Sequence, residues 1–230
     1  VPDPYTDRFA VSVDFDEDGA LYVGVPSDYR VLKLVQPGGP LSIDNGIVKV
    51  TVTETGGPAA YVWDGSEWVY QYYASWDWGT VLWLDDVAYT TGYLYDGCTV
   101  DLFTPISNQI EVIDGGKRIV TVYDAGETGV RVTQTFTIMD GDRHITKDWK
   151  VENLGGDLIT NARLYHGGDS YFGGEDDAAS YYEPTKSMVY LRNREFNAWG
   201  IMGFWANPAT PASHYFSGPY NDGGTDLVET

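Results

Sequence analysis

The sequence is short of basic side chains, which number 14 against 34 acidic ones and leave a net charge of −20. Nucleic acids and anionic membranes are bound through clustered lysine and arginine, so neither is an expected partner. No apolar run approaches the roughly 18 residues of a membrane-spanning helix, so no membrane span is expected. The acidity fits a protein outside the cell or on its surface with a neutral or cationic partner. Acidity for solubility alone is the other interpretation.

Cysteine and known catalytic motifs are also scarce. Cys98 is the single cysteine, so no internal disulfide can form, and its setting in "GCTVDLF" indicates a buried small side chain. There is no Gly-x-Ser-x-Gly, no His-Glu-x-x-His and no P-loop. The sequence therefore favours a binding module over an enzyme without excluding an enzyme.

Helical periodicity is missing too, whereas alternating and β-branched runs recur along the whole chain. The clearest are "KRIVTVY", "VRVTQTFTI" and "RHITKDWKVEN", and a "DGD" turn joins the second to the third. They predict a three-stranded antiparallel meander over residues 117–152. About fifteen strands are expected in all, which indicates an all-β fold: a large two-sheet antiparallel β-sandwich with little or no helix.

The segment "QPGGP" at residues 36–40 is the best candidate for a domain boundary. We expect residues 1–40 to form an N-terminal strand pair that packs on or leads into the main domain. Residues 41–230 would then form the β-sandwich domain.

An aromatic stripe runs through "EWVYQYYASWDWGTVLWLDD" at residues 67–86. Its even positions carry Trp68, Tyr70, Tyr72, Trp76 and Trp78, which an extended chain would place on one face. Such a stripe forms either core or a platform for sugar rings. Under the second interpretation, the ligand-binding residues are the tryptophans that we expect to be exposed, namely Trp76, Trp78 and Trp83.

The segment "NARLYHGGDSYFGGEDDAASYYEP", residues 161–184, is predicted to be a loop of about twenty residues, a length typical of functional loops. Its carboxylates could converge on a metal such as calcium, stay solvated, or serve sugar chemistry. The metal candidates are Asp169, Glu175, Asp176 and Asp177. The ligand-binding candidates are Arg163, His166 and Tyr171, and an enzyme would use His166 and Asp169 as catalytic residues. A purely structural His166, and an Arg163 that only pairs with a carboxylate, are the alternatives.

Two segments resemble the galactose mutarotase-like sandwiches, a family also called supersandwiches. "LSIDNGIVKVTVTETGG" is similar to their opening strand pair, and "VTQTFTIMDGDRHITKDWKVENLGGDLI" is similar to their central meander. "YHGGDSYFGG" resembles their histidine-containing segments that line the sugar site. The resemblance implies a large antiparallel sandwich and a connection to carbohydrate, including domains of lyases and glycosidases that bind without catalysing.

These features lead to one hypothesis and two alternatives. The hypothesis is an extracellular or cell-surface β-sandwich module that binds carbohydrate or another cell-surface component, with calcium as a candidate cofactor. The first alternative is a carbohydrate-active enzyme, either an epimerase, a polysaccharide lyase or a glycoside hydrolase, with His166 at its site. The second is a structural surface-layer or filament subunit that associates with itself.

Overall fold

The computed structural model describes residues 13–15, 21–25, 30–34, 39–73, 79–92, 100–174, 178–192 and 200–215. This part of the chain holds strands and two short 3-10 turns but no α-helix, which confirms the predicted all-β class. The strands are β1 Val13–Phe15, β2 Leu21–Val25, β3 Arg30–Leu34, β4 Leu41–Asp44, β5 Val48–Val52, β6 Pro58–Trp63, β7 Trp68–Tyr73, β8 Gly79–Leu84, β9 Val87–Thr90, β10 Val100–Leu102, β11 Thr104–Ile113, β12 Gly116–Asp124, β13 Val130–Met139, β14 Thr146–Asn153, β15 Ala162–Gly167, β16 Asp169–Ser170, β17 Ala179–Glu183, β18 Met188–Arg192 and β19 Met202–Trp205; the turns are η2 Phe172–Gly174 and η3 Pro184–Lys186.

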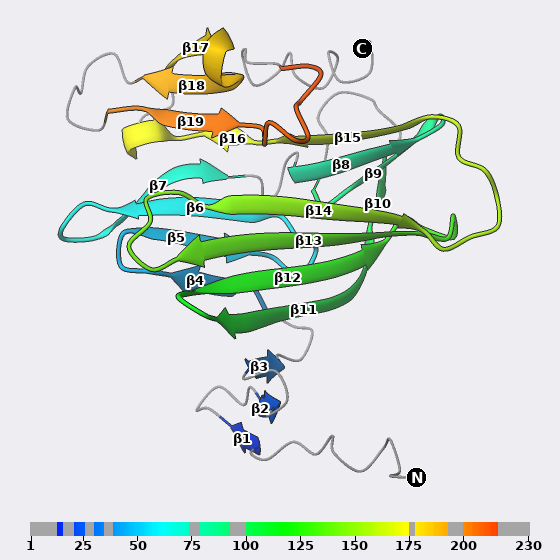
Figure 1. Cartoon of the computed structure of the whole chain (residues 1–230), viewed down its shortest axis with the longest axis horizontal. Coiled ribbons are helices and arrows are strands. Elements are labelled where there is room, and N and C mark those ends of the chain that lie inside the picture. The colour runs from blue at the N-terminus through cyan, green and yellow to red at the C-terminus, as the bar shows by residue number, and fades with distance from the viewer. Residues whose placement is uncertain are drawn as a thin grey trace.

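One layer of the sandwich is a seven-stranded sheet in the order β1-β2-β3-β11-β12-β13-β14. The facing layer consists of two smaller sheets, β10-β9-β8-β15 and β16-β7-β6-β5-β4 (Figure 1). A further sheet, β17-β18-β19, lies beyond β15 and β16 at the top of Figure 1. The chain passes from the four-stranded to the five-stranded sheet where β15 leads into β16, so the two smaller sheets meet there.

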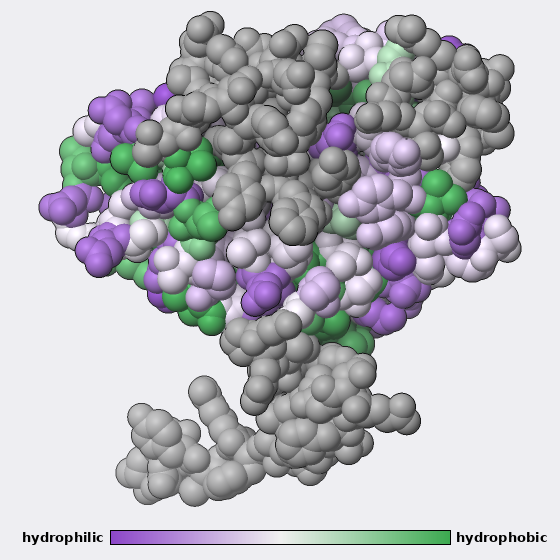
Figure 2. Space-filling view, turned by 180° about the vertical axis from the view of Figure 1, so that it is seen from behind, coloured by the Kyte–Doolittle hydropathy of each residue, from purple (hydrophilic) through white to green (hydrophobic). Residues whose placement is uncertain are grey.

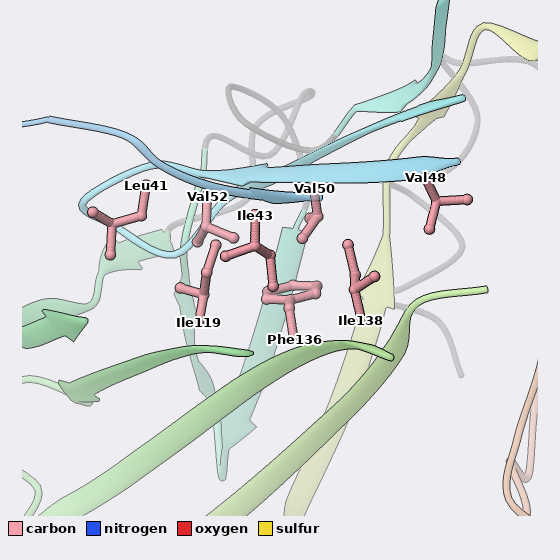
Figure 3. Packing of buried hydrophobic residues seen from close by; sticks show 8 residues of the cluster. All are labelled: Leu41, Ile43, Val48, Val50, Val52, Ile119, Phe136 and Ile138. Atoms are coloured by element: carbon pink, nitrogen blue, oxygen red, sulfur yellow. The ribbon is translucent and has the colours of Figure 1, made fainter. Parts of the chain in front are cut away.

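The core between the five-stranded and seven-stranded sheets follows from simple alternation. Strand β5 buries Val48, Val50 and Val52 and turns the residues between them outward. These valines point toward side chains of β12 and β13 across the sandwich (Figure 3). The whole cluster consists of Leu41, Ile43, Val48, Val50, Val52, Ile119, Phe136 and Ile138.

A second core cluster joins the four-stranded sheet to the same seven-stranded sheet. It contains Leu82, Leu84, Tyr89, Phe103, Tyr123, Ala125, Val130 and Val132, with Trp149 and Ile159 packed against it. Because β12 and β13 contribute to both clusters, the two smaller sheets share one opposing layer.

The meander predicted over residues 117–152 is present as β12, β13 and β14, paired antiparallel in sequence order. Strand β13 buries every second residue from Val130 to Ile138, and its threonines face the other side. Gly141, in the turn between β13 and β14, has φ 79°, the left-handed conformation that the "DGD" sequence supplies.

The N-terminal strands extend the large sheet. Strand β3 pairs antiparallel with β11, and Leu34 lies opposite Gln109. Strand β4 then begins the five-stranded sheet at Leu41. The division of the chain at residue 40 stays a prediction. In the described part of the chain, no helix has the length and apolar character needed to cross a bilayer.

Candidate functional site: a lysine–histidine cluster and an aromatic sheet face

Within residues 161–184, expected to form a long loop, most of the described residues lie in strands. All six residues of β15 pair with β8, and β16 pairs with β7. The loop prediction is wrong because every residue of β8 is buried, and the backbone groups of a buried strand need hydrogen-bond partners on both sides. Gly173 has φ 73° within η2, and it is the only one of the four glycines at 167, 168, 173 and 174 with a positive φ.

His166 lies near the end of β15, where the two smaller sheets meet. Its Nε2 atom is 2.8 Å from Lys147 Nζ on β14 and 3.2 Å from the Tyr72 hydroxyl on β7. Its Nδ1 atom is 3.4 Å from Thr80 Oγ1 on β8. Three sheets therefore bring these four side chains together, and we call them the lysine–histidine cluster.

A buried polar network orients the imidazole. Thr80 donates its hydroxyl hydrogen to Gln134 Oε1 at 2.6 Å, so its oxygen can only accept further hydrogen bonds. It accepts one from Trp149 Nε1 at 2.8 Å. The contact from His166 Nδ1 must then be a donation, which puts the imidazole proton on Nδ1 and leaves Nε2 as an acceptor. Gln134 is itself held by donating to the carbonyl of Gly56 at 2.7 Å.

Lys147 points into this seam from the inner face of β14. Its Nζ atom lies 4.6 Å from the ring centroid of Tyr72, 5.3 Å from that of Phe204 and 5.8 Å from that of Phe136. None of the ion pairs within the described ranges includes Lys147. Burial lowers the pKa of Lys147 from 10.5 to about 7.

The pKa values of the neighbouring groups are also shifted in the directions that favour their neutral forms. Burial, and then the nearby charge of Lys147, hold the pKa of His166 well below 6.5. Burial, with the negative charge of Asp169 second, raises the pKa of Tyr72 above its usual value of 10. At neutral pH the cluster thus combines an amine close to its titration point, an imidazole acceptor and a protonated phenol.

Tyr72 reaches this cluster through a β-bulge. Tyr61 pairs with Tyr70 but Ala60 pairs with Tyr72, so Gln71 is the extra residue. Tyr70 consequently faces outward while Tyr72, 4% exposed, faces the core beside the inward Ala60. The prediction that all even positions of this stripe share one face is therefore wrong, because a bulge breaks the alternation.

The outward aromatic side chains of β6 and β7, together with Tyr171 just after β16, form a second feature, which we call the aromatic face. Its members are Tyr61, Trp63, Trp68, Tyr70 and Tyr171. The ring centroids of Tyr61 and Tyr70 are 4.8 Å apart, those of Trp63 and Trp68 are 5.4 Å apart, and Tyr171 lies 6.4 Å from Tyr70. Trp63 and Tyr171 are about 40% exposed. Lys49 on β5 places its Nζ 4.3 Å from the centroid of Tyr61.

Two of the other predicted ligand-binding residues lie on the far side of the four-stranded sheet. Trp83 was expected to be exposed, and this is wrong: it is 9% exposed and packs with Val81 and Ala88. It faces its cross-strand partner Arg163, whose guanidinium carbon is 5.9 Å from the indole. Neither Trp83 Nε1 nor Arg163 Nε has a hydrogen-bond partner in the described residues. The geometry does not bring this pair to His166.

The remaining predicted site residues divide between the described and the undescribed parts. Asp169 lies in β16 opposite Tyr73, close enough to act on Tyr72 electrostatically, and Tyr171 belongs to the aromatic face. No group of three or more possible metal ligands occurs within the described ranges. The candidates that lie outside them are Trp76, Trp78, Glu175, Asp176 and Asp177, and calcium binding stays a prediction.

Sequence reasoning missed the partners of His166, although two of them leave a signal. Lys147 alternates with Ile145, just before β14, and Trp149 within it, and these two residues pack against the two core clusters. In β13 every second residue is buried, and Gln134 is the polar residue among them. A polar residue at a core position indicates a buried hydrogen-bond network, but not which residues on other strands complete it.

Comparisons of this chain with protein-family models, with curated proteins and with solved structures each give no match. The resemblance to galactose mutarotase-like sandwiches therefore stays a prediction.

Proposed function

We propose that this chain is an extracellular or cell-surface β-sandwich module that binds carbohydrate through its aromatic face. The observation that carries the proposal is the clustering of five aromatic side chains, four that face outward on β6 and β7 and Tyr171 beside them, with Trp63 and Tyr171 about 40% exposed. Aromatic rings supply apolar surface on which the C–H faces of sugar rings stack.

The aromatic face spans several strands, which suits an extended ligand. Lys49 lies opposite Tyr61, Tyr61 lies opposite Tyr70, and the amide of Tyr171 donates to the carbonyl of Gln71 at 2.8 Å. This row crosses three strand spacings of about 4.8 Å, or roughly 14 Å. A surface of that length accommodates a chain of several sugar units.

Polar groups border the rings and would bind hydroxyl groups of the ligand. Ser42 and Thr51 form a hydrogen-bonded pair on the same sheet, and Asp64 caps the β6–β7 turn by accepting from Ser66 and Glu67. Figure 2, seen from behind, shows hydrophilic and hydrophobic residues interspersed with no large continuous apolar area among the coloured ones. Such a mixed surface suits a polar ligand better than an apolar partner.

The charge of the molecule narrows the ligand class. With a net charge of −20, the chain repels polyanionic glycans over distances comparable to the Debye length. Neutral polysaccharides are therefore the proposed ligands.

The test compares binding of the wild type with that of a variant carrying Trp63→Ala and Trp68→Ala. Affinity electrophoresis in gels with neutral polysaccharides, followed by calorimetry with soluble oligosaccharides, measures Kd. We expect at least tenfold weaker binding in the variant, because each lost stacking surface contributes about 1 kcal/mol or more. The matched control is Trp205→Ala, which removes a 57% exposed tryptophan from the three-stranded sheet. Equal Kd values for all three proteins, or no binding by the wild type, would contradict the proposal.

A further inference from the structure

We infer that Lys147 is a reactive amine that captures small aldehydes and ketones as imines, with His166 as the proton acceptor beside it. The site lies at the seam where the three sheets meet and does not use the aromatic face. Tyr72 and Tyr70 point to opposite sides of β7, so the two features are separated by the sheet itself. The reactivity of Lys147 can therefore be tested independently of carbohydrate binding.

Burial withdraws Lys147 from the water that would solvate its ammonium form. Three aromatic rings, those of Tyr72, Phe136 and Phe204, lie within 6 Å of Nζ. The ionisable groups that face it from β15 and β7 are His166 and Tyr72, with Asp169 of β16 acting on Tyr72. Desolvation lowers the pKa of the amine to about 7, so a substantial fraction of the molecules carries a neutral amine at neutral pH.

The cluster is not fully enclosed by the described residues. Lys147, His166 and Phe204 are each half-buried, so the cluster lies near the surface of the sandwich although most of its area is covered. A partly covered site of this kind admits a small carbonyl compound and limits its hydration.

The hydrogen bonds place an acceptor and a donor beside the reacting nitrogen. The network through Thr80 and Gln134 leaves the Nε2 lone pair of His166 facing Lys147 Nζ at 2.8 Å. The Tyr72 hydroxyl, 3.2 Å from the same Nε2, stays protonated and can donate to a carbonyl oxygen. The first two proton transfers of imine formation, to the carbonyl oxygen and from the amine nitrogen, thus each have a candidate group beside the amine.

The reaction balances without any further reagent. The neutral Lys147 nitrogen attacks the carbonyl carbon, a C–N bond forms, and the carbonyl π electrons move to oxygen, which takes a proton from Tyr72. His166 Nε2 accepts a proton from the new ammonium nitrogen, and this proton returns through the cluster to restore the phenol. The carbinolamine then loses its hydroxyl group with a second proton as water, which leaves C=N between Lys147 and the former carbonyl carbon.

The test labels the full chain with glycolaldehyde and sodium cyanoborohydride at pH 7, and peptide mass spectrometry then quantifies the adduct at each of the six lysines. Ordinary lysines are neutral to about one part in a thousand or less at this pH. We expect Lys147 to be labelled at least tenfold faster than Lys150 on the same strand. The side chain of Lys150 is 69% exposed and pairs with Glu152 at 2.7 Å. The Lys147 rate should fall about tenfold per pH unit well below pH 7.

Two variants distinguish activation of Lys147 by its neighbours from simple exposure of its side chain. Tyr72→Phe keeps the ring but removes the donor, and His166→Gln removes the basic acceptor; each should slow labelling of Lys147 severalfold and leave Lys150 unchanged. The alternative is an ammonium group held in a cage of rings, and it predicts no preference for Lys147 at pH 7. That result, or a labelling midpoint near pH 10, would overturn the inference even where the polysaccharide test succeeds.

Discussion

At the scale of single residues, Gln134 connects the core of the sandwich to the lysine–histidine cluster. Its side-chain oxygen accepts from Thr80, Trp149 and Tyr123, and its nitrogen donates to the carbonyl of Gly56. Gln134, Thr80 and Tyr123 are all 0% exposed, so none of these hydrogen bonds can be replaced by bulk water. Each one broken leaves a desolvated polar atom behind.

Substituting Thr80→Val should therefore lower the free energy of unfolding by about 1–3 kcal/mol, because it strips Trp149 and His166 of a common acceptor. The matched control is Thr51→Val, which removes the exposed hydrogen bond to Ser42 and should change stability by less than about 0.5 kcal/mol. Urea unfolding measures both. Equal losses in the two variants would show that the network adds nothing to stability.

The lowered pKa of Lys147 also predicts how stability depends on pH. Between pH 7 and about 10 the unfolded chain keeps a proton on this lysine that the folded chain has released, so stability from this group rises with pH. The slope is at most about 1.4 kcal/mol per pH unit. Urea unfolding at pH 7, 8 and 9 should show this rise in the wild type relative to Lys147→Met. A constant difference between the two proteins over this range would contradict it.

At the scale of elements, turns and bulges determine which side chains each strand presents on each face of its sheet. Periodicity predicted the meander, since alternation is written directly in the sequence of β13. The extra residue Gln71 was not predictable, because nothing in "WVYQYY" distinguishes a bulge from regular alternation. Its buried side chain accepts from the amide of Gly173, a contact 102 residues away that no local pattern encodes.

Two glycines in turns of the five-stranded sheet offer a matched pair. Gly46 and Gly56 both have positive φ, but a Cβ on Gly46 would meet nothing within 4 Å. A Cβ on Gly56 would lie 3.1 Å from Thr91 and Tyr123 and 3.2 Å from Gln134. Gly46→Ala should cost about 1 kcal/mol, from backbone strain alone. Gly56→Ala should cost about 1–3 kcal/mol more, because it also crowds the network. Thermal and urea unfolding test the difference, and equal costs would contradict it.

At the scale of the whole molecule, the candidate site is assembled from strands that are distant in sequence. The lysine–histidine cluster joins residues 72, 80, 147 and 166. The sequence singled out His166 from its glycine-rich setting, but only the pairing of sheets shows that a lysine lies against it. The two-layer fold was predictable from strand count and alternation, whereas the division of one layer into two sheets was not.

The net charge of −20 predicts a salt effect on the whole fold. Repulsion among surface carboxylates opposes the compact state, and 1 M salt shortens the Debye length to about 3 Å. The thermal midpoint should therefore rise by several degrees between 0.05 and 1 M NaCl at pH 7. At the isoelectric point, about pH 4.2, the same salt change should have little effect. An equal rise at both pH values would point to salting out of apolar surface instead.

Strand β14 ends the order of described strands in the large sheet and carries a charge at four of its eight positions, Lys147, Asp148, Lys150 and Glu152. An open strand of apolar and β-branched residues would invite another chain to pair with it, and charges on such a strand, above all one that points inward, make that pairing costly. Lys147 therefore has a second consequence besides the chemistry proposed for it. Replacing it with an apolar residue would remove a barrier to aggregation on a strand of eight residues at the end of the sheet order.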